Sequence, residues 1–236
     1  MTDAGPAGGR RGRSPLVLAV LTAIGLALVA AFISLGVWQL QRRVWKLNLI
    51  ATVEARLHAA PVAAPPAAGP ADTYRRVSVR GVFRNDRETF VQAVTERGPG
   101  YWVLTPLVGS NFTVLVNRGF VPPEKRAEHD RPSGPVPVTG LIRLTEPKGG
   151  FLRSNDAAAD RWYSRDVAAI ASAKHLGAVA PYFIDADRTP NPGGYPIGGL
   201  TVVAFRNSHL SYALTWFGLA ILTVVALVIL WRKRRE

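Results

Sequence analysis

Two long runs of apolar residues lie near the ends of the chain and set its organisation. Residues 16–38 include no charged side chain over 23 positions, and residues 210–231 include none over 22. As helices these runs rise about 34 and 33 Å, which is enough to cross the hydrocarbon core of a bilayer. We therefore predict two transmembrane helices, over residues 15–40 and 207–231.

Between these runs the pattern changes to polar and apolar positions that alternate with a period of two, as in half-buried β-strands. The strand-like residues 101–108 and 112–120 are separated by Gly109, Ser110 and Asn111, which indicates a hairpin. Further strands are expected at 77–82, 88–94, 136–144, 181–185 and 200–206.

One helix is expected to interrupt the strands. Ser164 can cap it, Val167, Ile170 and Ala171 form an apolar face, and Gly177 ends it. Before the strands, residues 59–71 contain seven Ala and four Pro, and this composition predicts a semi-rigid spacer.

The fold class that follows is a membrane α+β protein, in which two transmembrane helices flank one mostly antiparallel β domain with one or two helices. The predicted segments are a basic tail (1–14), the first span (15–40), a juxtamembrane segment and Ala/Pro-rich linker (41–71), the extracytoplasmic β-rich domain (72–206), the second span (207–231) and a second basic tail (232–236).

The net charge of +13 suggests nucleic-acid binding at first sight, but the position of the charge argues against it. Basic residues gather in the two tails and beside the first span, without an aromatic-plus-basic recognition pattern. Short cytoplasmic segments retain Lys and Arg, so we expect both termini in the cytoplasm of a multi-pass plasma-membrane protein that contacts lipid and binds no nucleic acid. A cleavable signal peptide, cut near Val29-Ala30-Ala31, is the alternative. The apolar run continues beyond that point, which favours a retained anchor.

The composition also limits the chemistry. The chain has no cysteine, and its one methionine is Met1, so disulfides, thiolate metal sites and a cysteine nucleophile are excluded. A haem iron would have to be held by His or Tyr. The sequence contains no serine-nucleophile, phosphate-loop or dinucleotide motif, and its acidic residues show no catalytic spacing. We therefore expect a protein that is not an enzyme.

His209 is the candidate ligand because of its position. Asn207 or Ser208 can cap the second span, which places His209 in its first turn, where the helix N-terminus and low polarity favour a neutral imidazole able to bind a metal. Tyr212 and Trp216 follow at i+3 and i+7 and share its face. The alternative is an interfacial histidine within an ordinary aromatic belt.

The first span supplies a possible partner surface. Trp38, Arg42 and Trp45 are spaced at i, i+4 and i+7, so the cation lies between two aromatic rings on one helical face. Such a face suits a flat apolar ring system that carries carboxylates. The alternative is that these residues only anchor the helix at the membrane surface.

Several segments together resemble the Surfeit locus protein 1 family. In chain order they are LGVWQLQRRVWK (35–46), YRRVSVRGVF (74–83), RGPGYWVLTPL (97–107), VLVNRGFVP (114–122), RWYSRDVAAIA (161–171), YFIDA (182–186) and NSHLSYALTWFGLA (207–220).

The resemblance implies a two-pass membrane protein that assists assembly of cytochrome c oxidase. Its implied partners are oxidase subunit I and the haem a synthesis machinery, and its implied cofactor is transiently held haem a. His209 matches the family's key histidine, and we place Trp38, Arg42, Tyr212 and Trp216 beside the haem as our own hypothesis. A scaffold that grips an assembly intermediate without holding haem is the alternative.

Residues Asn117, Arg118 and Gly119 match a characteristic motif of the same family. From the residues alone, they read as a structural turn at the end of a strand, with Gly119 for backbone freedom and Arg118 for an ion pair. The sequence gives their chemical role no further definition.

Overall fold

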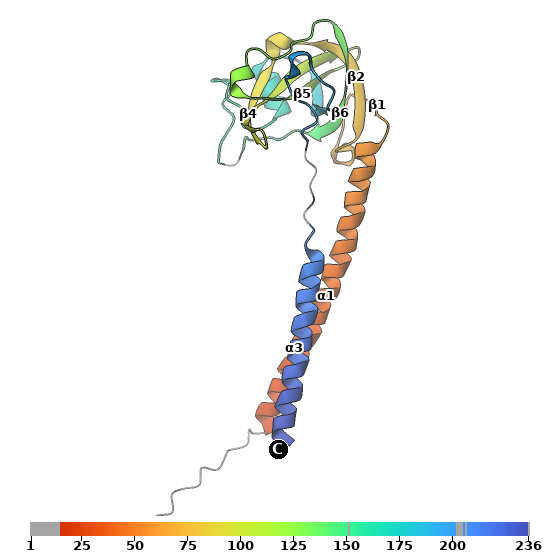
Figure 1. Ribbon diagram of the computed structural model, residues 1–236, viewed down its shortest axis with the longest axis vertical. Coiled ribbons are helices and arrows are strands. Elements are labelled where there is room, and N and C mark those ends of the chain that lie inside the picture. Colours follow the sequence, from red (N-terminus) through yellow and green to blue (C-terminus); the bar gives the residue numbers. More distant parts are fainter. Residues whose placement is uncertain (1–14, 151, 202–204, 206, 236) are drawn as a thin grey trace, which may run out of the picture. The chain divides into compact units, whose positions relative to one another are not determined.

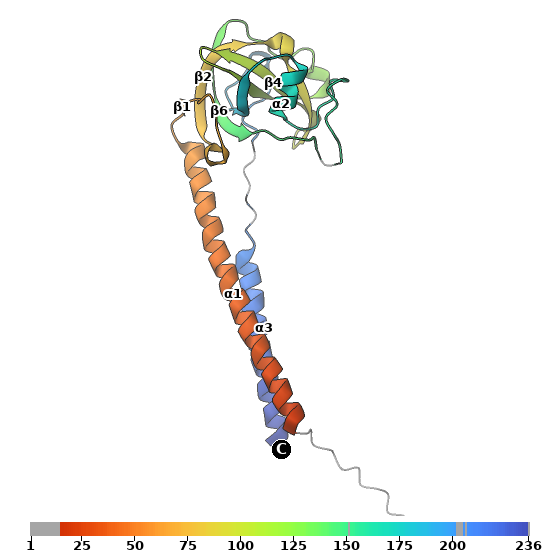
Figure 2. The ribbon, with the colours of Figure 1, turned by 180° about the vertical axis from the view of Figure 1, so that it is seen from behind.

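The computed structural model describes residues 15–150, 152–201, 205 and 207–235. It divides into two compact units: a helix pair, built from residues up to Ala51 together with those from Ala204 onwards, and a β domain over Thr52–Val203. The helix pair consists of α1 (Pro15–His58) and α3 (His209–Arg235), which lie side by side in Figures 1 and 2. Both are long and apolar enough to cross a membrane, and α1 continues well past the predicted end at residue 40.

The β domain is one sheet that closes into a barrel (Figure 1). Its strands follow the order β1-β2-β6-β7-β5-β4-β3, and an additional pairing of β2 with β4 closes the ring. The strands are β1 (Val62–Ala63), β2 (Arg76–Phe83), β3 (Thr89–Thr95), β4 (Gly98–Gly109), β5 (Thr113–Val121), β6 (Pro135–Leu144) and β7 (Val179–Ala186). The helical elements are α2 (Val167–Ala173) and the 3₁₀ turns η1 (Pro70–Asp72), η2 (Asn85–Arg87), η3 (Pro123–Lys125) and η4 (Pro192–Gly194).

The expectation of a mostly antiparallel sheet is corrected in two respects. The sheet is closed, and the pairs β1–β2 and β5–β7 are parallel. After β6 the chain returns through α2 before β7 begins, so β7 enters the gap between β5 and β6 in the same direction as β5. α2 lies in the connection between β6 and β7, which are antiparallel neighbours, and the parallel β5–β7 pair joins two strands that β6 and α2 separate in the chain.

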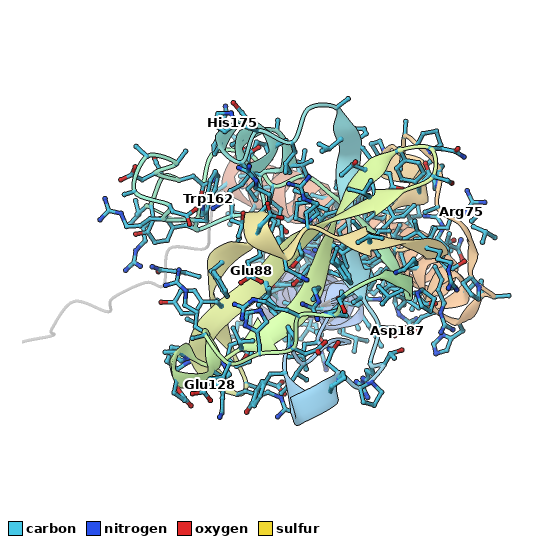
Figure 3. The ribbon with its side chains drawn as sticks, turned by 90° about the horizontal axis from the view of Figure 1, so that it is seen from above. Arg75, Glu88, Glu128, Trp162, His175 and Asp187 are labelled. Carbon is cyan, nitrogen blue, oxygen red and sulfur yellow. The ribbon has the colours of Figure 1, made fainter. Side chains whose placement is uncertain are left out.

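Residues of β5 alternate between two buried clusters, which explains why this strand is buried along almost its whole length. Val114 and Val116 pack in one cluster with Tyr182, while Leu115 packs in the other with Trp162. Helix α2 covers the second cluster through Val167, Ile170 and Ala171, the apolar face that the sequence predicts. Trp162 is fully buried and is labelled in Figure 3.

The N-terminal cap of α2 differs from the prediction. Asp166 caps the helix, because its Oδ1 accepts a hydrogen bond from the backbone N–H of Ala169 at 3.1 Å. Ser164 is buried, and its Oγ accepts from the backbone N–H of Gly149 and from Asn155 Nδ2, both at 3.0 Å. A carboxylate two residues closer to the helix therefore replaces the hydroxyl as its cap.

The Ala/Pro-rich residues 59–71 pack on the barrel, whereas the sequence predicts a spacer. Strand β1 pairs with β2, and Ala64 and Ala68 contact the first core cluster. The Tyr182 hydroxyl donates a hydrogen bond to the Pro65 carbonyl at 2.6 Å. Proline-rich chain of this kind is extended, so it lies against a sheet as readily as it spans a gap.

The chain after β7 is held to the barrel by backbone hydrogen bonds. Ile197 and Phe120 exchange two N–H to C=O bonds of 2.9 Å. Of the strand predicted at 200–206, Leu200 and Thr201 are irregular, and residues 202–204 and 206 lie outside the described residues.

Candidate functional site

The two long helices pack along a seam with a heptad-like spacing. The buried and half-buried positions of α1 are separated by alternate steps of four and three residues, and one stripe of α3 follows the same steps. The positions are Leu18, Thr22, Gly25, Val29, Phe32, Gly36, Gln39, Arg43, Lys46 and Ile50 on α1, and His209, Ala213, Trp216, Ala220, Thr223, Leu227 and Leu230 on α3.

Small residues let the two helices approach closely, as is common between membrane helices. A Cβ atom on Gly36 would come within 2.5 Å of the Phe217 ring, and one on Gly25 within 2.6 Å of Leu227. Ala213 and Ala220 are buried on the opposite helix.

His209 lies in this seam and bonds to the other helix. It is the first residue of α3, and Ser208, whose carbonyl accepts from the Tyr212 N–H, precedes it at the cap position. The ring Nδ1 of His209 and Oε1 of Gln39 are 2.7 Å apart. Because the amide oxygen can only accept, Nδ1 carries the proton.

This hydrogen bond fixes the chemistry that the imidazole offers. An imidazole with its one proton on Nδ1 has the lone pair of Nε2 for a metal, which is the arrangement common to metal-binding histidines. Gln39 was not predicted from the sequence. The signal that could have identified Gln39 is its polar side chain within the apolar sequence of the first predicted span. It lies at the end of that span, at the level where His209 begins the second span.

The structure separates the aromatic residues predicted beside His209. Trp216 lies in the seam and stacks on Phe32, with ring centroids 5.7 Å apart and an interplanar angle of 26°. Tyr212 and Trp38 project outward, with 57% and 49% of their surfaces exposed. Trp216 is therefore engaged between the helices, and Tyr212 and Trp38 are open to a ligand.

The cations near this level of the helix pair lie against aromatic rings. The guanidinium of Arg42 is 4.7 Å from the centre of the Trp45 ring, and Lys46 Nζ is 5.2 Å from that of Phe205. Arg42 is exposed and Arg43 is half-buried at a seam position. Arg206 lies outside the described residues.

The donor groups of the described residues are compatible with haem iron. Within the described ranges, no group of three or more His, Asp or Glu residues could hold a metal ion. A porphyrin brings four nitrogen ligands of its own, so one protein imidazole is enough to hold its iron. The Nε2 of His209 fits that requirement, and Tyr212, Trp38 and Arg42 are exposed elsewhere on the helix pair.

The Asn117-Arg118-Gly119 motif lies in β5 and has structural contacts in the barrel. The Arg118 guanidinium, 3% exposed, bonds to Asp130 Oδ2 at 3.0 Å and lies over Phe83. Gly119 has φ +129°, and a Cβ there would come within 2.2 Å of the Ile197 carbonyl oxygen. Only glycine tolerates both conditions. The ion pair of Arg118 and the backbone freedom of Gly119 agree with the sequence-based interpretation, but the predicted turn is wrong, because the motif lies within β5 and not at its end.

Asn117 belongs to a buried polar network around Asp185. The Asp185 carboxylate accepts hydrogen bonds from Asn117 Nδ2 and Arg143 Nη1, both at 2.8 Å, and from the Thr201 hydroxyl at 2.9 Å. Arg165 bridges this carboxylate to Glu146. Burial lowers the pKa of Arg165, but the two carboxylates outweigh burial and raise it. The network lines a cavity of about 190 Å³ with its charges paired, which indicates a structural role.

The fold and the site define a membrane protein in which two apolar helices precede and follow a closed β-barrel domain in the chain. Residues 26–221 match the model of the SURF1 family. The chain is 40% identical to Surfeit locus protein 1 of Mus musculus over 84% of this chain and 71% of that protein. It is 37% identical to Surfeit locus protein 1 of Xenopus tropicalis, over 91% and 76%, and 37% identical to a SURF1-like protein of Monosiga brevicollis, over 88% and 86%. The chain belongs to the SURF1 family, which implies a part in oxidase assembly.

Proposed function

We propose that the protein helps haem a reach subunit I of cytochrome c oxidase, and that it holds the haem transiently through His209 Nε2. The observation that carries this proposal is the 2.7 Å hydrogen bond between His209 Nδ1 and Gln39 Oε1. It orients the ring and leaves one nitrogen available as a ligand.

The roles of the neighbouring residues follow from their positions. Gln39 is a positioning residue, since it acts on the ligand through the imidazole. Tyr212 and Trp38 offer exposed ring faces to a flat apolar group, and Arg42 offers a guanidinium that suits a propionate. Haem a, when bound, supplies the iron and its other nitrogen ligands. The chain's own part is to bind and orient, so we propose a carrier and not an enzyme.

We propose that the protein lies in the plasma membrane, with both termini in the cytoplasm and the β-barrel outside. The basic residues of the two tails support this orientation, whereas the basic cluster at residues 42–46, just after the first span, argues mildly against it. It places His209, at the start of α3, at the outer edge of the membrane. The implied partners are subunit I and the haem a synthesis machinery, which meet the protein at that surface.

The direct test is the absorbance spectrum of the full-length protein purified from cells that make haem a. Wild type should carry haem, and His209→Gln should lose it, because glutamine keeps an amide for Gln39 and has no imidazole. Gln39→Ala keeps the imidazole and removes its hydrogen bond, so it should retain haem with a shifted Soret band. Retention of an unchanged spectrum by His209→Gln would exclude His209 as the ligand.

A second candidate function is a scaffold that binds an assembly intermediate without haem. The seam position of His209 favours it, because the bond to Gln39 also joins the two helices. Oxidase haem content in cells separates the candidates. If His209→Gln supports normal oxidase haem content while Gln39→Ala does not, the hydrogen bond serves the helix pair and the scaffold is the better account.

A further inference from the structure

The last part of strand β3 is an open sheet edge. β3 is the terminal strand of the sheet order and pairs with β4 on its inner side. On its outer side, within the described part of the chain, it meets one isolated parallel bridge between Val91 and Trp162. The Gln92 N–H donates across that bridge to the Trp162 carbonyl at 2.8 Å.

The backbone of Val94 points to the same open side. Residues two apart in a strand direct their N–H and C=O groups alike, so Val94 repeats the orientation of Gln92. Its partner across the hairpin is Pro99, which has no N–H to exchange and therefore fits a position without ladder hydrogen bonds. The Val94 side chain is 88% exposed. An unpaired edge of this kind is a template for another strand.

A groove borders this edge on each face of the β3–β4 hairpin. The Trp102 groove, about 990 Å³, is lined by Val94, Arg97, Trp102, Arg188 and Leu200, among others. The Tyr101 groove, about 490 Å³, is lined by Val94, Tyr101, Arg153 and Tyr163, among others. Tyr101 and Trp102 are consecutive in β4 and so point to opposite faces. Val94 borders both grooves.

The charge along the two grooves has one prevailing sign. Three arginines, Arg97, Arg153 and Arg188, line them against one acid, Glu96. Arg188 bonds to the Gly199 carbonyl and Arg153 to the Gln92 amide, and neither contact is with a carboxylate. Across the described residues, no ion pair neutralises these three guanidinium groups. They are available to an acidic partner.

We propose that this edge is the docking site for an extended, acidic segment of a partner polypeptide. The segment adds as a strand beside Val94, pairs with its N–H and C=O, and directs alternate side chains into the Trp102 and Tyr101 grooves. Its carboxylates meet Arg97, Arg153 and Arg188. This interaction does not involve His209, and it stands whether or not the protein carries haem.

The test uses the full-length protein in nanodiscs and a labelled eight-residue peptide of alternating Glu and Val, capped by proline at each end. Binding is followed by fluorescence anisotropy, with a Lys and Val peptide for comparison. The acidic peptide should bind and the basic one should not. Hydrogen exchange should slow in residues 90–97 on binding. Equal binding of both peptides, or protection confined to other segments, would overturn the proposal.

Two pairs of variants test the contacts. Val94→Pro removes an outward N–H without touching the bonds to β4, so peptide affinity should fall by about tenfold, which is what one lost backbone hydrogen bond is worth. Val94→Thr keeps that donor and should bind like wild type. Arg188→Glu should weaken binding, whereas Arg80→Glu, an exposed site on β2 that lines neither groove, should not. Unchanged binding by Val94→Pro would exclude strand addition.

A second copy of the chain is the competing occupant, and light scattering on the wild type and the variants solubilised in detergent decides it. The partner proposal expects the same mass for wild type and Val94→Pro. A wild-type dimer that Val94→Pro converts to a monomer would show that the edge pairs with itself. If Val94→Pro does not fold, the Arg188→Glu and exchange results on the wild type still decide the proposal.

Discussion

Glu88, which is labelled in Figure 3, pairs with buried His129 and exposed Arg131 and so ties the chain after β5 to the start of β3. Its Oε2 is 3.0 Å from Nε2 of buried His129, and its Oε1 accepts from Arg131 at 2.6 Å. The other ring nitrogen of His129 faces the Arg126 carbonyl at 2.9 Å. Both ring nitrogens of His129 therefore have a polar partner.

We predict that Glu88→Gln lowers stability at neutral pH by about 1–3 kcal/mol. Burial raises the pKa of Glu88, but His129 and Arg131 outweigh burial and hold it below the ordinary 4.5. A lowered folded-state pKa means that the contribution is complete above the unfolded value and is lost as the pH falls through the folded one. Thermal unfolding across pH 3–7, in steps of about one unit, should show a weaker acid dependence in Glu88→Gln than in wild type. Exposed Glu124→Gln is the control and should follow wild type.

Tyr182 makes a prediction at alkaline pH. Burial, with a smaller effect from Asp72, raises its pKa from 10.0 to about 12. A raised pKa in a group that is neutral when protonated stabilises the fold below pH 10, and this contribution is lost as the pH rises towards 12. Ultraviolet titration should therefore show a late phenolate that Tyr182→Phe lacks. The same variant frees the Pro65 carbonyl and should lower stability by about 1 kcal/mol. A titration identical to wild type would contradict the assignment.

Among the elements, the pairing of α1 with α3 depends on glycine at the seam. We predict that Gly36→Ala destabilises the helix pair by about 1–3 kcal/mol, because the new methyl group meets the Phe217 ring at 2.5 Å. Gly218→Ala is the matched control, since a Cβ there meets no atom within 4 Å. Thermal unfolding in detergent, followed by circular dichroism, should separate the two. Equal melting curves would show that the seam tolerates the added methyl.

The sequence predicted the elements better than their pairing. Period-two patterning and turn residues locate β2 to β7 to within a few residues, and Gly109 to Asn111 mark the β4–β5 hairpin. The closing β2–β4 pair and the parallel β5–β7 pair join residues far apart in the chain, and alternation carries no information about neighbours. The packing of residues 59–71 on the barrel was not predicted for the same reason. An Ala/Pro-rich composition is equally compatible with a free spacer and with a segment that packs on a sheet.

The candidate site was predicted in part. His209 was identifiable from its position at the start of an apolar run, and Arg42 and Trp45 from their spacing. The residues through which α1 and α3 contact each other could not be predicted, because a helix that faces lipid is apolar on every side and has no separate apolar face to mark the contact. Gln39 and Phe32 were therefore missed, and Trp216 was assigned to a ligand face although it stacks on Phe32.

For the whole molecule, the proposed orientation makes a prediction that the absence of native cysteine makes easy to test. We expect a single cysteine at exposed Ala158 to react with a membrane-impermeant maleimide in intact cells. A cysteine added after Glu236 should react only after the membrane is opened. Labelling at both positions in intact cells, or at neither, would contradict the proposed topology.

The place of β7 in the ring has a consequence for biosynthesis. β7 (Val179–Ala186) pairs with β5 on one side and with β6 on the other, so the barrel cannot close until β7 has been synthesised. α3 begins soon afterwards, at His209. During synthesis, the edges of β5 and β6 that pair with β7 therefore stay unpaired until shortly before the last helix is made. Unpaired strand edges promote aggregation. Chains truncated before Val179 should be insoluble and quickly degraded when expressed in cells. Chains that lack only the residues after α3 should still fold the barrel and stay intact.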